Sequence, residues 1–258
     1  MNAVIAPPAG GPGTNGGPEP STADMLGRIP WLRHVAAATI ERLARQAVLH
    51  RVPAGSILFE QSETPTFAQW LLAGAVELVG VVGANEVAIE TVLPFDLLLP
   101  AAVLNRQPYL SRARVLEAAH LALIPADAFR DAVAGDHALC LAVLASQAAQ
   151  FRRQVKLLKN LKLRPAEERV GCYLLALVER HAPATAIRLP LEKRLIAGQL
   201  GMTRETFSRT LAAMARHGLR VAGDTLEVTD ATALRARFRL DPLIDAPEPV
   251  EPMAPRRG

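Results

Sequence analysis

The hydrophobic pattern of this chain changes its period twice, after Ala47 and again near Ala126, and these changes limit the fold more than any other feature. Between the two points, short apolar runs broken by glycine or proline recur roughly every ten residues, which is typical of a β sandwich or barrel. On either side, in Met25–Ala47 and from Ala126 on, apolar residues recur every three or four positions, as in amphipathic helices. We therefore expect an α+β chain, with Met25–Ala47 helical and Gly74 reversing the chain between two strands. The expected strands are Ala47–Val52, Ser56–Phe59, Phe67–Ala73, Ala75–Val82, Glu86–Val92, Arg112–Ala118 and His120–Pro125.

A long helix expected over residues 136–162 carries a heptad repeat. Its apolar positions are separated alternately by three and four residues, the pattern by which two helices wrap around each other. The pattern predicts a dimerisation helix, and a single amphipathic helix packed on its own domain is the alternative. The heptad positions are Leu141, Leu144, Ala148, Phe151, Val155 and Leu158.

A helix-turn-helix pattern follows in the segment E-K-R-L-I-A-G-Q-L-G-M-T-R-E-T-F-S-R. The first helix ends at Gly201, which supplies the turn conformation, and the second follows Thr203, whose hydroxyl can cap free backbone N–H groups. Further on, L-R-V-A-G-D-T-L-E-V predicts a hairpin wing over Leu219–Val228, and Ile187–Leu191 predicts an edge strand. The side expected to be buried comprises Leu195, Ile196, Leu200, Phe207, Leu211 and Met214.

Polar residues in the first turns of the second helix are candidates for contacts with base edges in the DNA major groove. Arginine can donate to guanine, and glutamate can accept from the cytosine amino group. Residues 190–239 hold nine basic and five acidic residues, a surplus of four that equals the formal net charge of the whole chain. This segment therefore has the charge expected of a surface that binds a polyanion. The expected DNA-binding residues are Lys193, Thr203, Arg204, Glu205, Ser208 and Arg209.

The order of these elements over residues 32–240 resembles the Crp/Fnr superfamily of bacterial transcription regulators. Its strongest motif, G-M-T-R-E-T-F-S-R, is similar to R-E-x-x-x-R of the cyclic-AMP-receptor branch and to E-x-x-S-R of the Fnr branch. The resemblance implies a homodimer that reads a palindromic TTGA-like operator, or a TGTGA-like one through Arg204, with RNA polymerase as a partner. It implies a cytoplasmic protein with no catalytic residues. The alternatives are a winged helix that contacts protein and a solvated helical hairpin.

The resemblance also implies a cyclic-nucleotide-binding-like β-roll, in which a G-E motif and an R-S motif hold the ribose and the cyclic phosphate. At the matching positions this chain has Leu98 and Leu99, then Tyr109 and Leu110. We therefore expect no cyclic nucleotide to bind, because a buried phosphate without a cationic partner is costly. Arginine could replace the missing anchor only through a shift in register. The expected effector pocket is apolar and comprises Leu98, Leu99, Tyr109, Leu110, Arg112 and Arg114.

The effector itself is unknown from sequence. Two cysteines, Cys140 and Cys172, are too few for a four-cysteine iron–sulfur cluster, and both are expected to be buried thiols in a reducing cytoplasm. No metal site is expected. Some relatives bind haem and sense nitric oxide or carbon monoxide, which makes haem sensing the alternative function. The candidate haem ligands are His34, His50, His120 and His137.

The domains expected from these patterns are a β-roll over residues 25–135, the dimerisation helix over 136–162 and a winged helix-turn-helix over 163–240. Gly- and Pro-rich residues 1–24 predict a disordered tail, and residues 241–258 a flexible one. A hinge is expected near 160–165, between the long helix and the DNA-binding domain. No signal peptide or membrane span is expected.

Overall fold

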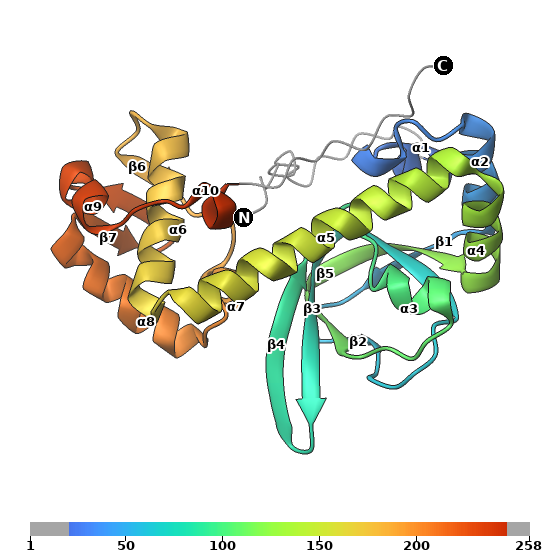
Figure 1. The fold of residues 1–258 in the computed structure, drawn as a ribbon, viewed down its shortest axis with the longest axis horizontal. Helices are drawn as coiled ribbons and strands as arrows, with labels where there is room; N and C mark the ends of the chain where they lie inside the picture. Colours follow the sequence, from blue (N-terminus) through green and yellow to red (C-terminus); the bar gives the residue numbers. More distant parts are fainter. Residues whose placement is uncertain (1–20, 247–258) are drawn as a thin grey trace. The chain divides into compact units, whose positions relative to one another are not determined.

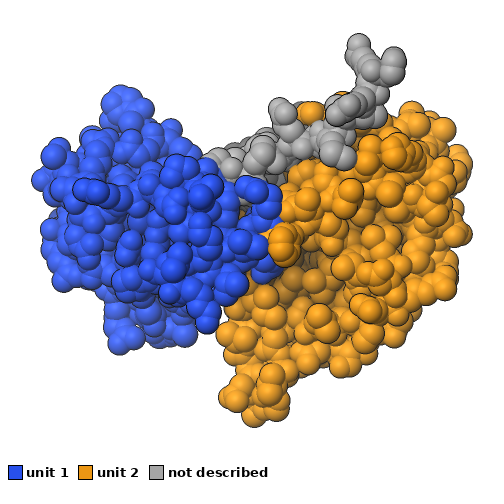
Figure 2. Space-filling view, in the orientation of Figure 1, with its two compact units in different colours: residues 1–11, 152–248 blue, residues 12–151, 249–258 orange. Residues whose placement is uncertain are grey.

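A computed structural model describes residues 21–246 of the 258-residue chain. These residues form two compact units, 21–151 and 152–246, which we call the N-terminal unit and the C-terminal unit (Figure 2). The α+β fold class expected from the sequence is confirmed: a β-sheet domain, a long helix and a helix-turn-helix with a small β wing follow one another along the chain (Figure 1).

The N-terminal unit begins with short helices. A capping box between Ser21 and Asp24 starts the first one, since the Ser21 hydroxyl accepts from the Asp24 N–H and the Asp24 carboxylate accepts from the Ser21 N–H. The predicted tail boundary at residue 24 is therefore wrong for residues 21–24, and residues 1–20 lie outside the described residues. The helical elements here are α1 (Thr22–Gly27), η1 (Pro30–Leu32) and α2 (Ala37–Gln46).

The sheet of this unit is antiparallel, with strand order β1-β5-β3-β4 and with β2 paired to β5. Alternating burial along β5 places residues such as Ala113 and Val115 in the core and leaves Arg112 and Arg114 on the opposite face. Two long strands replace the four short ones predicted for these segments. The strands are β1 (Val48–Val52), β2 (Ile57–Phe59), β3 (Phe67–Val82), β4 (Asn85–Val92) and β5 (Arg112–Pro125).

Gly74 does not reverse the chain, contrary to the prediction, because it lies inside β3. Its φ is 86°, and the pairing of β3 with β5 shifts register on both sides of it. A Cβ atom at this position would lie 2.4 Å from the carbonyl oxygen of Ala118. Glycine here therefore allows a β-bulge and a close approach of two strands. A glycine in a bulge and a glycine in a turn look alike in a single sequence, so the sequence did not distinguish them.

The long helix α5 (His137–Leu163) follows α3 (Pro100–Asn105) and α4 (Ala126–Gly135). Asp136 starts α5, because its carboxylate accepts from the Leu139 N–H at 3.0 Å and also from the Thr39 hydroxyl. One face of the helix packs on the core around Trp70 and Phe129. Among the described residues no single helix is long and apolar enough to span a membrane; only α4 and α5 together pass that test, and they meet at 112°.

The C-terminal unit packs its helices and a three-stranded sheet, order β6-β8-β7, around a core that includes Phe207 and Phe238. Residues 241–246 form the short helix α10 with Ile244 and Asp245 buried, so the predicted flexible tail is wrong for this stretch. Residues 247–258 lie outside the described residues. The elements are α6 (Ala166–His181), β6 (Ala186–Arg188), α7 (Lys193–Gln199), α8 (Arg204–Ala213), η2 (Met214–His217), β7 (Leu219–Ala222), β8 (Thr225–Val228), α9 (Ala231–Arg237) and α10 (Pro242–Asp245).

Candidate DNA-binding site and effector domain

The turn between α7 and α8 has the geometry expected from the sequence. Gly201 has a φ of 61°, and a Cβ atom there would lie 2.4 Å from the side chain of Leu161, near the end of α5. Arg169 of α6 donates to the Gly201 carbonyl at 3.4 Å. The turn is therefore packed against the end of α5 and the start of α6, and this contact fixes the position from which α8 projects.

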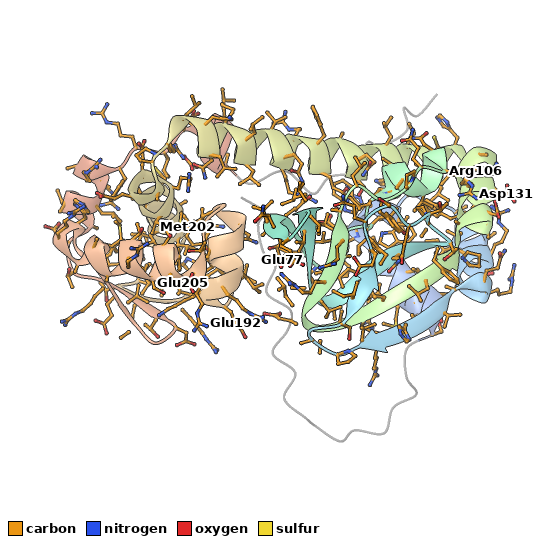
Figure 3. All side chains as sticks on the ribbon, turned by 90° about the horizontal axis from the view of Figure 1, so that it is seen from below. Glu77, Arg106, Asp131, Glu192, Met202 and Glu205 are labelled. Carbon is orange, nitrogen blue, oxygen red and sulfur yellow. The ribbon has the colours of Figure 1, made fainter. Side chains whose placement is uncertain are left out.

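The helix α8 presents the predicted recognition residues to solvent. Thr203 caps it, accepting from the Thr206 N–H at 3.2 Å, as predicted. Phe207 and Leu211 are buried, while Ser208 and Arg209 between them face outward. Met202 and Glu205 mark the turn and the start of this helix in Figure 3. The structure brings five of the six predicted residues together on this exposed surface: Thr203, Arg204, Glu205, Ser208 and Arg209. Lys193, the sixth, is half-buried at the start of α7.

Glu205 is held in its ionised form. Its own backbone N–H and the Thr203 hydroxyl hydrogen-bond to the carboxylate, and Arg204 and Arg209 lie near enough to add to the effect, so its pKa is below the usual range. An ionised carboxylate only accepts hydrogen bonds. Glu205 can therefore accept from the amino group of a base but cannot donate to one.

The basic surplus of the segment is not spread evenly. Arg235 is paired with Glu179 at 2.7 Å, and Arg216 and Arg237 are both paired with Glu167. These carboxylates belong to α6, outside the segment counted in the sequence, so their neutralising effect could not be seen from that count. Among the basic residues left without an ion pair to any described residue are Arg204, Arg209 and Arg220. Uncompensated positive charge therefore lies on α8 and on β7.

The predicted wing is present as the hairpin β7–β8, which turns at Gly223 with a φ of 59°. The strand β6 pairs with the free edge of β8. Arg188 of β6 is 84% exposed and donates to Asp224 in the hairpin turn at 2.8 Å. That contact lowers the pKa of Asp224. Arg188 and Arg220 were not among the predicted DNA-binding residues, although their outward positions follow from the alternation of the two short strands.

The heptad stripe of α5 is exposed in the single chain. Leu144, Phe151 and Leu158 are 57%, 69% and 54% exposed, which is high for large apolar side chains. The face that packs on the N-terminal core is a different one, with Leu139 and Val143 buried. Of the remaining heptad residues, Ala148 and Val155 are exposed and Leu141 is half-buried.

The positions that the resemblance assigns to a nucleotide are filled by core side chains. Tyr109 stacks on Phe59 with ring centroids 3.7 Å apart and is 3% exposed. Burial raises the pKa of Tyr109 to about 12, against a smaller opposite effect from a hydrogen bond with Gln69. Leu98 is buried in the same cluster, and Leu99 is half-buried. Leu110 is 86% exposed, so the prediction that it lines a pocket is wrong.

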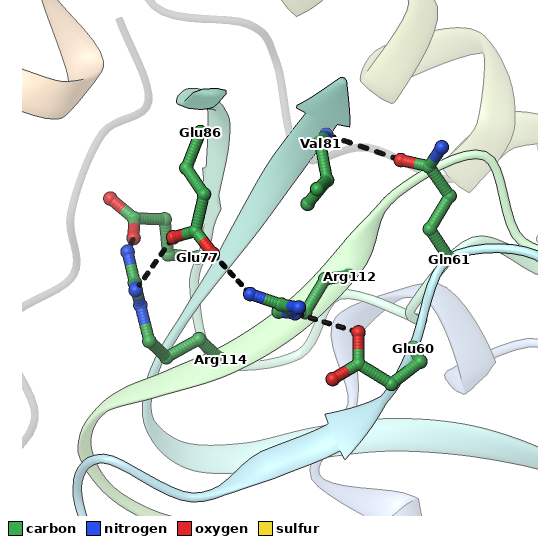
Figure 4. Close-up of polar contacts among 7 residues, drawn as sticks. All are labelled: Glu60, Gln61, Glu77, Val81, Glu86, Arg112 and Arg114. Atoms are coloured by element: carbon green, nitrogen blue, oxygen red, sulfur yellow. Dashed lines mark hydrogen bonds and ion pairs between the residues drawn. The ribbon is translucent and has the colours of Figure 1, made fainter. Parts of the chain in front are cut away.

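Arg112 and Arg114 are engaged in a cluster of ion pairs (Figure 4). Arg112 contacts Glu60 at 2.7 Å and also Glu86, while Arg114 contacts Glu77 at 2.7 Å and Glu86 at 3.2 Å. Hydrogen bonds to these carboxylates raise the pKa of both guanidinium groups. Three carboxylates thus surround two arginines. An anion would have to displace a carboxylate from either one, which makes both poor substitutes for a phosphate-binding arginine.

Most of the candidate haem ligands are exposed. His34, His50 and His137 are exposed, and His120 is half-buried on β5. Within residues 21–246 there is no group of three histidine, cysteine, aspartate or glutamate side chains placed to hold a metal ion. Cys172 is buried as predicted, and burial raises its pKa to about 11. Cys140 is exposed, so its predicted burial is wrong.

Known proteins match both units. Residues 49–136 match the cyclic nucleotide-binding domain, and residues 168–237 match the Crp-like helix-turn-helix domain. A comparison with curated proteins gave no match. Among solved structures, the chain is similar to FixK2 from Bradyrhizobium japonicum, with 20% identity and a TM-score of 0.60 over 76% of this chain and 98% of that one.

Two further structures extend this similarity. One is TTHB099, a CRP-family transcriptional regulator from Thermus thermophilus, at 22% identity and a TM-score of 0.54 over 72% of this chain and 95% of that one. The other is a proposed cAMP-binding regulatory protein from Silicibacter pomeroyi DSS-3, at 25% identity and a TM-score of 0.52 over 84% of this chain and 98% of that one.

A helix-turn-helix with an exposed basic recognition helix, on the same chain as a cyclic-nucleotide-binding-type β-roll, defines a class of DNA-binding transcription regulators. The chain belongs to the Crp/Fnr family, which confirms the resemblance seen in the sequence. It is a DNA-binding transcription regulator.

Proposed function

We propose that this regulator is a homodimer that binds a palindromic TTGA-like operator and responds to an effector other than a cyclic nucleotide. The observation that carries the proposal is the surface of α8, where ionised Glu205 lies between arginines that have no ion pair with a described residue. Glu205, Ser208 and Arg209 match the E-x-x-S-R motif of the Fnr branch. Arg220 on the wing strand β7 is exposed and placed to contact a phosphate beside the groove.

Dimerisation is supported by the exposed heptad stripe. A second copy of α5 would cover Leu144, Phe151 and Leu158 by the knobs-into-holes packing for which their spacing is suited. A two-fold dimer reads a palindrome whose half-sites lie about one helical turn apart. RNA polymerase as a partner and the cytoplasm as the location complete the proposal, because a regulator bound beside a promoter acts on the polymerase that arrives there.

The exclusion of cyclic nucleotides rests on chemistry at three places. Tyr109 stands where the phosphate-binding arginine is expected, Leu98 and Leu99 stand where the ribose-binding pair is expected, and the two nearby arginines are neutralised. A cyclic phosphate would lose its hydration without gaining a cationic partner, which costs several kcal/mol. We expect cyclic AMP and cyclic GMP at millimolar concentration to leave the melting temperature unchanged. A concentration-dependent rise would contradict this part of the proposal.

The DNA-binding proposal is tested by selecting duplexes from a random library with the full-length protein and measuring affinity by gel shift. Arg209→Ala should weaken binding of the best duplex by about 5- to 150-fold, equal to 1–3 kcal/mol, and relax selectivity at one base pair. Arg235→Ala is the matched control, since that arginine is already paired with Glu179. If Arg209→Ala binds the best duplex with unchanged affinity, α8 is not the helix that contacts the bases.

The same assay separates the alternative in which the winged helix contacts a protein. DNA binding through phosphate contacts must weaken steeply as salt rises, with a log–log slope near −0.9 for each phosphate neutralised. A wild-type protein that selects no duplex, or that shows no salt dependence, would favour the protein-binding alternative. Phe151→Glu, placed on the heptad stripe, should convert the dimer to a monomer in sedimentation velocity and weaken palindrome binding with it.

A further inference from the structure

The chain that follows α9 is anchored along α6. The ring of Phe238 occupies the space beside Gly171, where a Cβ atom would lie 2.3 Å from the ring. One residue further on, the Cys172 thiol donates to the carbonyl oxygen of Arg239 at 3.4 Å. Glycine and a small thiol on consecutive positions of α6 thus make room for this segment, which we call the C-terminal strap, residues 238–246.

The strap ends in the short helix α10, which presents one buried carboxylate. Asp241 caps the helix by accepting from the Leu243 N–H at 2.8 Å. The Asp241 N–H in turn donates to Asp245 Oδ2 at 2.7 Å. These contacts fix Asp245 on the inner side of the strap, and its side chain is only 2% exposed.

The partner of Asp245 is Arg164, which lies between the last residue of α5 and the first of α6. Arg164 Nη1 and Nη2 donate to the two carboxylate oxygens, both at 2.8 Å, and the arginine side chain is 6% exposed. The pair is therefore bidentate, which fixes both position and angle. Nη1 also reaches Asn160 Oδ1 on the last turn of α5 at 3.4 Å, and Nε lies 3.7 Å from Glu168 on the first turn of α6.

Two more contacts tie the same end of α5 into the C-terminal unit. Lys156 Nζ donates to the carbonyl oxygen of Ala246 at 2.8 Å, at the end of the strap. Leu161 packs against Gly201 in the turn before the recognition helix. The last turns of α5 therefore contact both the strap and the turn of the helix-turn-helix.

We propose that Arg164 and Asp245 are positioning residues for DNA recognition, which lock the α5–α6 junction so that the recognition helix keeps one fixed orientation relative to the end of α5. This inference rests on the proposed function, because a fixed orientation matters when two recognition helices must meet two half-sites. Bending at residues 160–165, the hinge expected from the sequence, would have to separate a buried ion pair and leave each charge without its partner. The junction therefore behaves as a rigid corner.

The test compares duplexes that differ only in spacing. The best palindrome selected by the wild-type protein is remade with one or two base pairs added to or removed from its centre, and affinities are measured for wild type, Asp245→Asn and Arg164→Lys. Wild type should prefer the original spacing. In both variants the affinity for the original spacing, divided by the affinity for the altered spacing, should fall at least about tenfold. A tenfold change lies within the usual range of coupling free energies between two sites. A purely structural role would weaken all duplexes by the same factor and leave the ratio unchanged.

Controls separate the failure of this inference from that of the proposed function. Arg235→Gln breaks an exposed ion pair in the same unit and should leave the spacing preference unchanged. If the wild-type protein selects no palindrome, the proposed function fails. If it does and Asp245→Asn keeps the wild-type ratio, only the rigid corner is overturned.

Hydrogen exchange gives a readout that needs no DNA and uses the milder Arg164→Lys variant. The charge stays but the bidentate geometry is lost, so amides at residues 160–169 should exchange at least about tenfold faster while those of β7 and β8 do not change. Unchanged exchange at the junction would overturn the proposal even if Asp245→Asn does not fold.

Discussion

The two units of this protein retain different parts of what the family's domains can do. In the C-terminal unit the residues of the recognition motif, such as Glu205 and Arg209, are present and exposed. In the N-terminal unit the β-roll is intact, yet Tyr109 stacks on Phe59 where a phosphate-binding arginine is expected. A fold depends on many buried apolar positions, whereas a ligand depends on a few polar ones. The few ligand-binding residues can therefore change while the buried apolar residues that maintain the fold are kept.

Arginine shows the same contrast. Arg112 and Arg114 are surrounded by three carboxylates, so this cluster carries a net negative charge. Arg204 and Arg209 have no ion pair within the part of the chain that the structure describes. The arginines at the start of β5 are therefore engaged by carboxylates, whereas those on α8 are open to a polyanion. A count of basic residues along the sequence does not make this distinction, because it depends on which carboxylates lie opposite.

The first prediction tests whether the Tyr109 side chain belongs to the packed core or lines an open pocket. Tyr109→Ala should lower the free energy of unfolding of the N-terminal unit by about 3–5 kcal/mol, because it removes a stacked, buried ring and leaves a cavity. The matched control is its neighbour: Leu110→Ala should change stability by less than about 0.5 kcal/mol, since Leu110 is exposed. Urea unfolding measures both. A small loss for Tyr109→Ala would indicate an open pocket and remove the contrast between the units.

The second prediction tests the strand crossing at Gly74. Gly74→Ala should cost about 2–4 kcal/mol, because the new Cβ atom would meet the backbone of Ala118 and Ala119 at a positive φ. Gly83→Ala, also at positive φ but in open space, should cost only about 1–2 kcal/mol. Hydrogen exchange should confine both losses to the N-terminal unit. Equal costs for the two variants would mean that β3 and β5 do not approach so closely.

The C-terminal site was predictable from sequence because its signals are local. Gly201, the Thr203 cap and the outward residues of α8 lie within nine positions of one another, and each acts through its own backbone or its helix. The heptad stripe of α5 was predictable for the same reason. Its exposure in the single chain, which favours dimerisation over packing on its own domain, came only with the structure.

The features that sequence did not predict depend on contacts between distant residues. Arg112 and Glu60 are 52 positions apart, and Arg164 and Asp245 are 81 apart. The local pattern at Gly74 fits a turn, because the strand that it lies against, near Ala118, comes more than forty residues later. Strap residues 241–246 lead into the proline-rich sequence A-P-E-P-V-E-P and therefore resemble the start of a tail. Their partners lie far away in the sequence. In each case the local pattern fits two structures, and a distant residue decides between them.

Two helix caps, one in each unit, allow the units to be compared through variants with a smaller effect on stability. Asp136→Ala and Thr203→Ala each remove a side-chain cap, from α5 and α8, and each should cost about 1 kcal/mol at neutral pH. Only Thr203→Ala should also weaken DNA binding. The hydrogen bond from Thr39 holds the pKa of Asp136 below its usual 3.8. Its stabilising effect is therefore present above about pH 4 and is lost as the pH falls through the lowered pKa.

The Asp136 variant should therefore approach wild-type stability in strong acid, while the threonine variant should not, because a hydroxyl does not titrate in this range. Thermal unfolding at pH 7 and near pH 3 measures the difference. A Thr203→Ala variant with unaltered DNA affinity would show that the cap does not help to place α8, and would weaken the contrast between a sensing unit and a reading unit.

The smallest effect concerns the two tyrosines, since the chain has one in each described unit, Tyr109 and Tyr173. Burial raises the pKa of Tyr109 to about 12, and it raises that of Tyr173 as well. Neither ring should ionise at pH 10, where an exposed tyrosine is half ionised. Because both folded-state pKa values are raised, this stabilising effect is complete below about pH 10 and declines as the pH rises toward the folded values.

Ultraviolet titration of wild type and Tyr109→Phe separates the two rings. The variant reports Tyr173 alone, and the difference between the two curves reports Tyr109. An ordinary titration near pH 10 in that difference curve would mean that Tyr109 is in contact with water, so that the β-roll holds a hydrated pocket there. A raised pKa would agree with a filled core at the position where a phosphate anchor is expected, and would sharpen the contrast with the exposed surface of α8.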